Sequence, residues 1–199
     1  LPERPTTTKT RVVARGQQVV RIDEEETSEL TTETMRRLDA LATEAISSAE
    51  VVLFEDYDKG ALHPAVIERG MAAALGRRLP TVVDPKFDSF HLYGGATLFK
   101  PNRRELAAAI PGMDPGSPLH LRQAAERLGV AHLLLTLGAD GMRLIPRQPD
   151  LPIHVIAAQA REVYDVSGAG DTVTAWAGAA LAAGATVLEA AQLANLAAG

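Results

Sequence analysis

Residues 132–137 (HLLLTL) form the most apolar of the predicted strands, and the turn at residues 138–141 (GADG) follows directly. Residues 142–145 (MRLI) then pair back across the turn. Other short apolar runs predict strands at residues 51–54, 81–83, 97–99 and 153–156. The run at residues 51–54 (VVLF) is apolar without interruption, which is typical of a strand buried on both faces of a sheet.

Helical patterns separate most of these strands. They cover residues 32–49, 64–76, 102–109, 117–128, 171–183 and 187–198. Pro64 is suited to the first turn of a helix, and Asn102 is a good N-cap. Strands that alternate with helices predict an α/β fold with a mostly parallel sheet that helices cover.

Polar residues follow four of the predicted strands. The four clusters are Glu55–Gly60, Asp84–Lys86, Lys100–Asn102 and Thr136–Gly138. Right-handed crossovers bring the carboxyl ends of parallel strands to one edge of the sheet, where such folds bind their ligands. The sequence therefore favours one shared site at this edge over four unrelated loops.

The N-terminal part of the chain has no helical period. Residues 11–15 and 18–22 predict a hairpin around Gly16 and Gln17, with one face exposed to water because polar and apolar residues alternate. We expect the acidic run at residues 23–26 to be a solvated connector. The chain opens on Leu1 and stops within a helical pattern, so we expect it to be incomplete at both ends.

Composition excludes several classes of protein. Hydrophobic residues make up 46% and charged residues 23% of the 199 residues, which is ordinary for a globular protein and excludes a disordered chain. A net charge of -5 without a basic run argues against binding to nucleic acid or an anionic membrane. Because the chain contains no cysteine, thiol catalysis and cysteine-bound metals are excluded. The sequence shows no membrane helix or signal peptide, and we expect a cytoplasmic protein.

The most informative motif is the stretch at residues 165–172 (DVSGAGDT), which an apolar helix follows. Gly168 and Gly170 let the backbone bend sharply and approach a ligand closely. The helix start adds N–H groups without partners and a partial positive charge, which together suit phosphate oxygens. Asp171 at the rim is placed to take a proton from an attacking hydroxyl, as phosphoryl transfer requires. A glycine-rich turn with Asp171 as a helix cap is the alternative that the motif alone leaves open.

Other motifs that bind nucleotides or carry out catalysis are not present in the sequence. A Rossmann pattern requires glycine at position 173, where the chain has valine. A Walker A loop is excluded because no Gly-Lys pair occurs, and the HExxH and GxSxG motifs are absent as well. The five histidines are scattered along the chain.

Residues 165–171 (DVSGAGD) resemble the C-terminal signature of the ribokinase/PfkB carbohydrate kinases, and the resemblance extends over essentially the whole chain. Within this family, several weaker motifs are similar to those of the D-glycero-β-D-manno-heptose 7-phosphate kinases of lipopolysaccharide precursor synthesis. They are residues 8–12 with 17–18 and 21–23, residues 56–60, and residues 84–86 with 93–98. Two residues depart from this subgroup: Glu55 replaces a small residue, and Lys100 is more typical of other sugar kinases in the family.

The resemblance implies a ribokinase-like sheet with a hairpin lid, so that residues 1–26 form the lid and connector and residues 27–199 the nucleotide-binding catalytic part. It implies that Asp171 is the catalytic base. The other implied roles are an anion hole formed by the backbone of Gly168, Ala169 and Gly170, and an ATP site formed by Asn102, Arg103, Arg104, Glu105, Thr136, Gly138, Gly141 and Asn195. Glu105 is further implied to bind Mg²⁺ through water.

Four basic residues are candidates for contacts with substrate or phosphate. The sequence assigns no ion-pair partner to Lys59 or Lys86 in their loops, and we expect both to meet phosphate as point charges. Lys9 and Arg11, in the first predicted strand, are weaker candidates for which a solvated surface position is equally compatible.

The function that the resemblance implies is phosphorylation of D-glycero-β-D-manno-heptose 7-phosphate at O1 by ATP with Mg²⁺. A ribokinase- or fructokinase-like enzyme and a non-catalytic nucleotide-binding fragment remain as alternatives, with an oxidoreductase a distant third. The expected partners are a sugar phosphate, ATP and, through an exposed lid hairpin, a second copy of the chain. Whether a nucleotidyltransferase domain follows, as in some heptose kinases, is left open.

Overall fold

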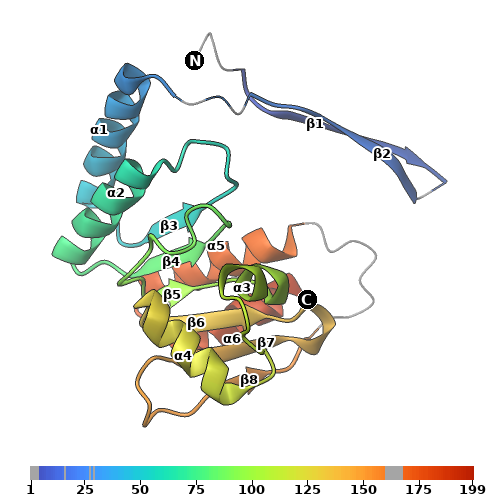
Figure 1. Ribbon diagram of the computed structural model, residues 1–199, viewed down its shortest axis with the longest axis vertical. Helices are drawn as coiled ribbons and strands as arrows, with labels where there is room; N and C mark the ends of the chain where they lie inside the picture. The colour runs from blue at the N-terminus through green and yellow to red at the C-terminus, as the bar shows by residue number, and fades with distance from the viewer. Residues whose placement is uncertain (1–4, 16, 27, 29, 160–167) are drawn as a thin grey trace.

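The computed structural model describes residues 5–15, 17–26, 28, 30–159 and 168–199. Its centre is a six-stranded sheet in the order β3-β4-β5-β6-β7-β8 (Figure 1). The strands are β3 (Val52–Glu55), β4 (Thr81–Asp84), β5 (Leu98–Phe99), β6 (His132–Thr136), β7 (Met142–Pro146) and β8 (His154–Ile156). Strands β3 to β6 are parallel neighbours, whereas β7 and β8 are antiparallel to the strands before them. The predicted α/β fold with a mostly parallel sheet is confirmed.

Helices cover both faces of this sheet. The helices are α1 (Thr32–Ser48), α2 (Pro64–Gly76), α3 (Arg103–Ala109), α4 (Pro118–Leu128), α5 (Ala169–Ala182) and α6 (Val187–Ala198), and one short turn of 3₁₀ helix spans Gly138–Asp140. Helices α2, α3 and α4 contribute to the core on one face, α5 and α6 to the core on the other, and α1 packs against α2.

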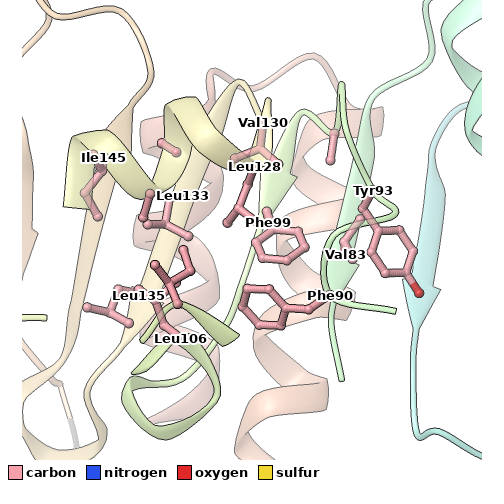
Figure 2. Packing of buried hydrophobic residues seen from close by; sticks show 14 of the residues in the cluster. Val83, Phe90, Tyr93, Phe99, Leu106, Leu128, Val130, Leu133, Leu135 and Ile145 are labelled. Atoms are coloured by element: carbon pink, nitrogen blue, oxygen red, sulfur yellow. The ribbon is translucent and has the colours of Figure 1, made fainter. Parts of the chain in front are cut away.

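Successive residues of a strand contribute to the two cores in turn. On β6, Leu133 and Leu135 belong to the first core and Leu134 to the second, because successive strand residues point to opposite faces. The first core also contains four aromatic residues, and among them Phe90 packs edge-on against Phe99 with ring centroids 5.0 Å apart (Figure 2). Both faces of β6 are buried at Leu133, Leu134 and Leu135, which explains why these three residues are apolar. The prediction that residues 51–54 are buried on both faces is wrong, because β3 is an edge strand of the sheet and Leu53 is 40% exposed.

Helix α5 begins two residues earlier than the sequence predicts. Gly168, with a φ of 82°, is its N-cap, so Asp171 lies within the first turn and does not start the helix. The left-handed backbone of Gly168 costs a glycine little and turns the chain into the helix at this point. The preceding residues of the glycine-rich motif, Asp165 to Ser167, lie outside the described residues.

The hairpin of β1 (Thr8–Ala14) and β2 (Gln17–Glu24) is longer than predicted. Asp23 and Glu24 pair within β2, so the prediction of a connector over residues 23–26 is wrong for these two residues. Every described residue of both strands is exposed, so the expectation of a single wet face is also wrong. The reason is visible in Figure 1, where the hairpin projects away from the sheet and none of the described helices or strands packs against either of its faces.

Among the described residues, no helix has the length and apolar character that crossing a membrane requires.

Candidate active site

A cavity of about 560 Å³ lies at the carboxyl ends of the parallel strands, between the starts of α3 and α5 and the end of α6. This is the edge at which the polar clusters were expected to meet, and three of them line the cavity. The lining residues that the sequence predicted to be functional are Lys86, Asn102, Glu105, Thr136, Gly138, Gly141, Ala169, Gly170, Asp171 and Asn195. Segments more than 100 residues apart in the chain therefore come together as predicted.

The start of α5 forms one wall of this cavity. Within the described part of the chain, no side chain caps its first turn, so the N–H groups of Ala169, Gly170 and Asp171 keep the partial positive charge of a helix start. A Cβ atom on Gly170 would lie 3.6 Å from Nζ of Lys100 and 4.0 Å from Oδ2 of Asp84. Glycine at this position thus keeps open the space in front of the buried ion pair.

Asp171 is exposed at the rim of the cavity and is not packed into the core. Its Oδ1 accepts a hydrogen bond of 3.1 Å from the hydroxyl of Tyr57, in the loop after β3. Burial, followed by the hydrogen bond and the charge of Asp171, raises the pKa of Tyr57 to about 12, so the phenol remains a donor at neutral pH. The sequence analysis did not single out Tyr57, because its partner lies 114 residues away.

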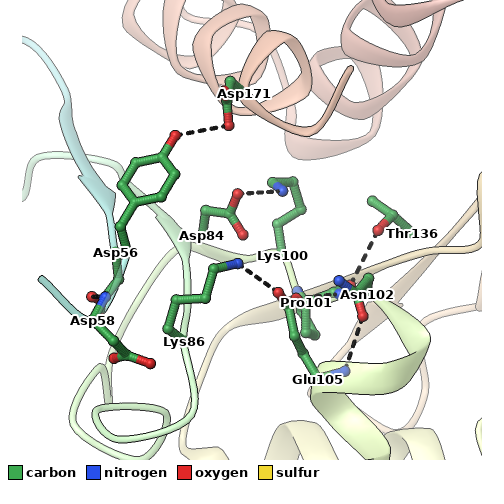
Figure 3. Close-up of polar contacts among 11 residues, drawn as sticks. Asp56, Asp58, Asp84, Lys86, Lys100, Pro101, Asn102, Glu105, Thr136 and Asp171 are labelled. Atoms are coloured by element: carbon green, nitrogen blue, oxygen red, sulfur yellow. Dashed lines mark hydrogen bonds and ion pairs between the residues drawn. The ribbon is translucent and has the colours of Figure 1, made fainter. Parts of the chain in front are cut away.

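A buried ion pair forms the floor beside α5. Nζ of Lys100, whose residue is 3% exposed, lies 2.9 Å from Oδ2 of Asp84 (Figure 3). Burial raises the pKa of Asp84, and the charge of Lys100 opposes this rise. Both residues belong to polar clusters that the sequence placed at this edge, because each follows an apolar strand, but the sequence assigned neither of them a role or a partner.

The opposite wall is a network of side chains that bind one another. Asn102 and Glu105 form a reciprocal capping box at the start of α3, and Oε1 of Glu105 lies 2.6 Å from Nζ of Lys86 (Figure 3). Although burial alone would lower the pKa of Lys86, its hydrogen bond to Glu105 and the charge of that carboxylate raise it. Lys86 therefore has a partner that the sequence did not assign.

Lys59 also pairs with a carboxylate, that of Glu25 in the connector after the hairpin. Its charge is thus directed to the connector, and Lys59 does not line the cavity. The absence of an assigned partner for both lysines in the sequence reflects the distance along the chain, since Lys86 and Glu105 are 19 residues apart and Lys59 and Glu25 are 34 apart.

The remaining predicted basic residues lie outside the cavity. Lys9 and Arg11 are exposed on β1, and Arg104 is exposed on α3. Arg103 forms a surface ion pair of 3.3 Å with Asp140. Gly168 does not line the cavity either, although the two residues after it do.

The loop after β6 and the end of α6 complete the cavity. Gly138 has a φ of 61° with open space at its Cβ position, whereas a Cβ atom on Gly141 would clash with the backbone of residues 156–158. Position 141 therefore requires glycine, because residues 156–158 pass too close to leave room for a side chain. Asn195 is 5% exposed, and its Nδ2 donates to the carbonyl oxygen of Ala157 at 2.8 Å. Thr136 is directed to the carbonyl oxygen of Pro101, at 3.4 Å.

Three carboxylates meet between the two walls. Glu55, Asp84 and Asp171 each offer one oxygen, and these oxygens lie within 4.8 Å of one another. Burial raises the pKa of Glu55 to about 7, and the negative charges of Asp84 and Asp171 add to the effect while Lys100 opposes it. An all-oxygen cluster of this kind has the donor chemistry that Mg²⁺ prefers. The sequence placed Glu55 in the polar cluster Glu55–Gly60 and marked it as a departure from the heptose kinases, but did not identify it as a possible metal ligand.

Comparison with known proteins identifies the family. The model of the pfkB family of carbohydrate kinases matches residues 1–199. The chain belongs to this family. The "Bifunctional protein HldE" of Pelobacter propionicus is 47% identical over 204 residues, covering 98% of this chain and 40% of the relative. The protein of the same name from Azorhizobium caulinodans is 45% identical over 198 residues, covering 98% of the chain and 41% of the relative. The chain thus spans about 40% of the length of these curated relatives.

Solved structures confirm the ribokinase-like fold. Phosphofructokinase-2 from Escherichia coli, in complex with substrates and products, superimposes with a TM-score of 0.73 at 19% identity, covering 96% of this chain and 62% of that one. Ribokinase from Arabidopsis thaliana, complexed with ribose and ATP, gives a TM-score of 0.70 at 20% identity, covering 98% and 62%. The resemblance that the sequence motifs indicated is confirmed.

Proposed function

We propose that the chain is the nucleotide-binding catalytic part of an ATP-dependent sugar kinase, with residues 1–26 as lid and connector and residues 27–199 as the catalytic part. The observation that carries this proposal is the start of α5, where N–H groups that no described side chain caps and an exposed Asp171 face the same cavity. Phosphoryl transfer requires both features, since one stabilises the moving phosphoryl group and the other accepts a proton from the nucleophile.

The proposed reaction transfers the γ-phosphoryl group of ATP to O1 of D-glycero-β-D-manno-heptose 7-phosphate and yields the 1,7-bisphosphate and ADP. Asp171 accepts the proton of the anomeric hydroxyl, whose oxygen attacks the γ-phosphorus while the bond to the β–γ bridging oxygen breaks. The HldE relatives and the heptose-kinase-like motifs support this substrate. We also propose that this reaction belongs to lipopolysaccharide precursor synthesis and takes place in the cytoplasm.

The residues of the cavity fit ATP and Mg²⁺ in their chemistry. The start of α5 and the space beside Gly170 suit phosphate oxygens, and Lys100 adds a positive charge nearby. Thr136, Gly138 and Gly141 would lie along the phosphates and Asn195 near the adenine. Bound Mg²⁺ would neutralise phosphate charge. Asp84 would meet the ion directly, and Glu105 through water, because both of its oxygens already have partners in the protein.

Replacement of Asp171 tests the proposed reaction. Asp171→Asn removes the proton acceptor and leaves the shape of the site intact, so turnover should fall by about 10²–10⁴-fold while ATP still binds. ADP release measured with a panel of sugars and sugar phosphates, together with calorimetric titration of ATP, separates the two effects. Asp150→Asn, an exposed carboxylate remote from the cavity lining, is the matched control. Near-normal turnover in the Asp171 variant would refute the assigned role.

The same panel separates the alternatives. Lys100 and the fold shared with phosphofructokinase-2 and ribokinase favour a different PfkB-type sugar kinase as second candidate, and turnover of a sugar other than the heptose phosphate would identify it. ATP binding without ADP release for any sugar would identify a non-catalytic nucleotide-binding part.

We also propose that the hairpin carries a contact between two copies of the chain. Its strands expose Val13 and Val19 by 58% and 66%, and exposed apolar strands favour association. Sedimentation of the wild type and of Val13→Lys tests this proposal, which predicts that the variant is monomeric at concentrations where the wild type is not.

A further inference from the structure

The loop after β3 fixes one position firmly and presents the next to the cavity. Asp56, which is 4% exposed, accepts hydrogen bonds from the hydroxyls of Ser89 and of Tyr93, the latter at 2.9 Å, and from the backbone N–H of Asp58 at 2.9 Å. A buried carboxylate with several donors is costly to displace, so it anchors the root of the loop. Tyr57 follows immediately and is half exposed.

Tyr57 reaches from this anchored root to the start of α5. Its hydroxyl donates to Oδ1 of Asp171, and this is the hydrogen bond drawn to Asp171 in Figure 3. Asp171 itself is exposed at a helix start, where an unrestrained side chain samples several rotamers. One oxygen of the carboxylate is thus held by a group from a different part of the fold.

We propose that Tyr57 is a positioning residue for the base: its hydroxyl holds Oδ1 of Asp171, so that Oδ2 is presented to the sugar hydroxyl. This inference rests on the proposed kinase function and adds a residue to its site. A base acts efficiently only when its acceptor atom lies within hydrogen-bond reach of the proton it takes, so loss of the restraint lowers turnover more than substrate binding. The Tyr57 phenol is suited to this role because it stays protonated at neutral pH.

Two variants at one position separate the hydroxyl from the ring. Tyr57→Phe keeps the ring and removes the donor, and Tyr57→Leu removes both. We expect both to lower kcat by about tenfold with KM changed less than twofold, the order of loss expected for one hydrogen bond to a charged group. A Phe variant with wild-type kcat, or a loss in the Leu variant alone, would overturn the inference. Because Tyr57 is half exposed, urea unfolding should show that both variants are folded.

A double-mutant cycle asks whether Tyr57 acts through Asp171. In an Asp171→Ala background, Tyr57→Phe should change the residual single-turnover rate less than twofold, because the group that it positions is gone. A loss of about tenfold in both backgrounds would show an effect independent of the base and would contradict the proposal.

Crystal structures of the wild type and of Tyr57→Phe decide the matter without an activity assay. We expect the Asp171 side chain to occupy one rotamer in the wild type and to shift or divide between rotamers in the variant. An unchanged carboxylate position would overturn the inference. If the wild type turned over no sugar, the kinase proposal would fail while this structural comparison still tested the role of Tyr57.

Discussion

The polar groups on the two walls of the cavity differ in whether other side chains of the protein pair with them. On the wall that β4, β5 and α3 supply, Lys100 pairs with Asp84, Lys86 with Glu105, and Glu105 with the capping Asn102. On the wall that α5 supplies, the described residues place no side-chain cap on the first turn, and Asp171 is exposed beside it.

This difference separates the buried, paired part of the site from its exposed part. Charges that are buried must be paired, so the first wall is saturated and stiff and its residues are costly to replace. The partial positive charge at a helix start is tolerated in water and is stabilised by a bound anion. The second wall can therefore stay exposed until a phosphate binds. We therefore expect variants of the first wall to change stability and variants of the second to change activity.

The largest effect on stability is expected for Lys100→Met. The change leaves the carboxylate of Asp84, a residue only 8% exposed, buried without its partner. Breaking a buried pair in this way costs about 3–5 kcal/mol of unfolding free energy. Urea denaturation followed by circular dichroism measures the loss.

Two further variants make this prediction specific. Lys100→Met combined with Asp84→Leu should recover part of the loss, because no buried charge is then left alone. Arg103→Met removes a surface pair with Asp140, whose side chains are 57% and 72% exposed, and should cost less than about 1 kcal/mol. Equal losses of unfolding free energy in Lys100→Met and Arg103→Met would contradict the expectation that the first wall is stabilised by its buried pairs.

A smaller effect, a loss of activity without a loss of stability, is expected for Gly170→Ala. The new Cβ atom would lie 3.6 Å from Nζ of Lys100, in the space proposed for phosphate oxygens. We expect kcat/KM to fall about tenfold, on the scale that small misplacements at a reacting centre cost. Stability should rise by about 0.5–1 kcal/mol, because alanine is the better helix residue.

The matched control for this glycine is Gly76→Ala at the end of α2, where a Cβ atom would meet nothing within 4 Å. It should leave kcat/KM unchanged. If both alanine variants retained full activity, the wall formed by α5 would not be the place where phosphate binds.

The fold followed from the sequence because its signals are local. The apolar run at residues 133–135 and the cap at Asn102 each determine a strand or a helix from a few neighbouring residues. The early start of α5 was not predicted, because glycine at position 168 serves as N-cap by its backbone geometry and has no side chain that marks a cap. The exposure of both hairpin faces could not be predicted from alternation, which shows that faces differ but not whether anything covers them.

The site was predictable in its residue types and not in its pairings. The three strand-end clusters that line the cavity follow from the rule that parallel strands end at one edge, whereas Gly141 and Asn195 came from the family resemblance. Partners such as Tyr57 and Asp171, which are 114 residues apart, depend on how loops from different strands meet. Because the energies of buried charges are set by these non-local contacts, the sequence could name Lys86 but not its bond to Glu105.

The smallest effect concerns pH and compares Glu55, between the two walls, with Glu189 in the exposed capping box of α6. Burial raises the pKa of Glu55 from 4.5 to about 7, whereas hydrogen bonds from Thr186 lower the pKa of Glu189. A raised carboxyl pKa means that the folded state binds more protons, so this contribution to stability is present below about pH 4.5 and is lost as pH rises through 7. A lowered pKa has the opposite sign: its contribution is present above the ordinary value and is lost as pH falls through the folded-state pKa.

Glutamine at each position should therefore produce opposite trends in urea unfolding between pH 4 and 8. Stability of Glu55→Gln relative to the wild type should improve as pH rises from about 4.5 to 7, whereas the deficit of Glu189→Gln should shrink as pH falls toward the acid end. Gln can still complete a capping box, so the second variant isolates the charge from the cap. If the free energies of unfolding of Glu55→Gln and the wild type changed in parallel with pH, the pKa of Glu55 would be the same in the folded and the unfolded chain. Burial between the walls would then not raise the pKa of Glu55.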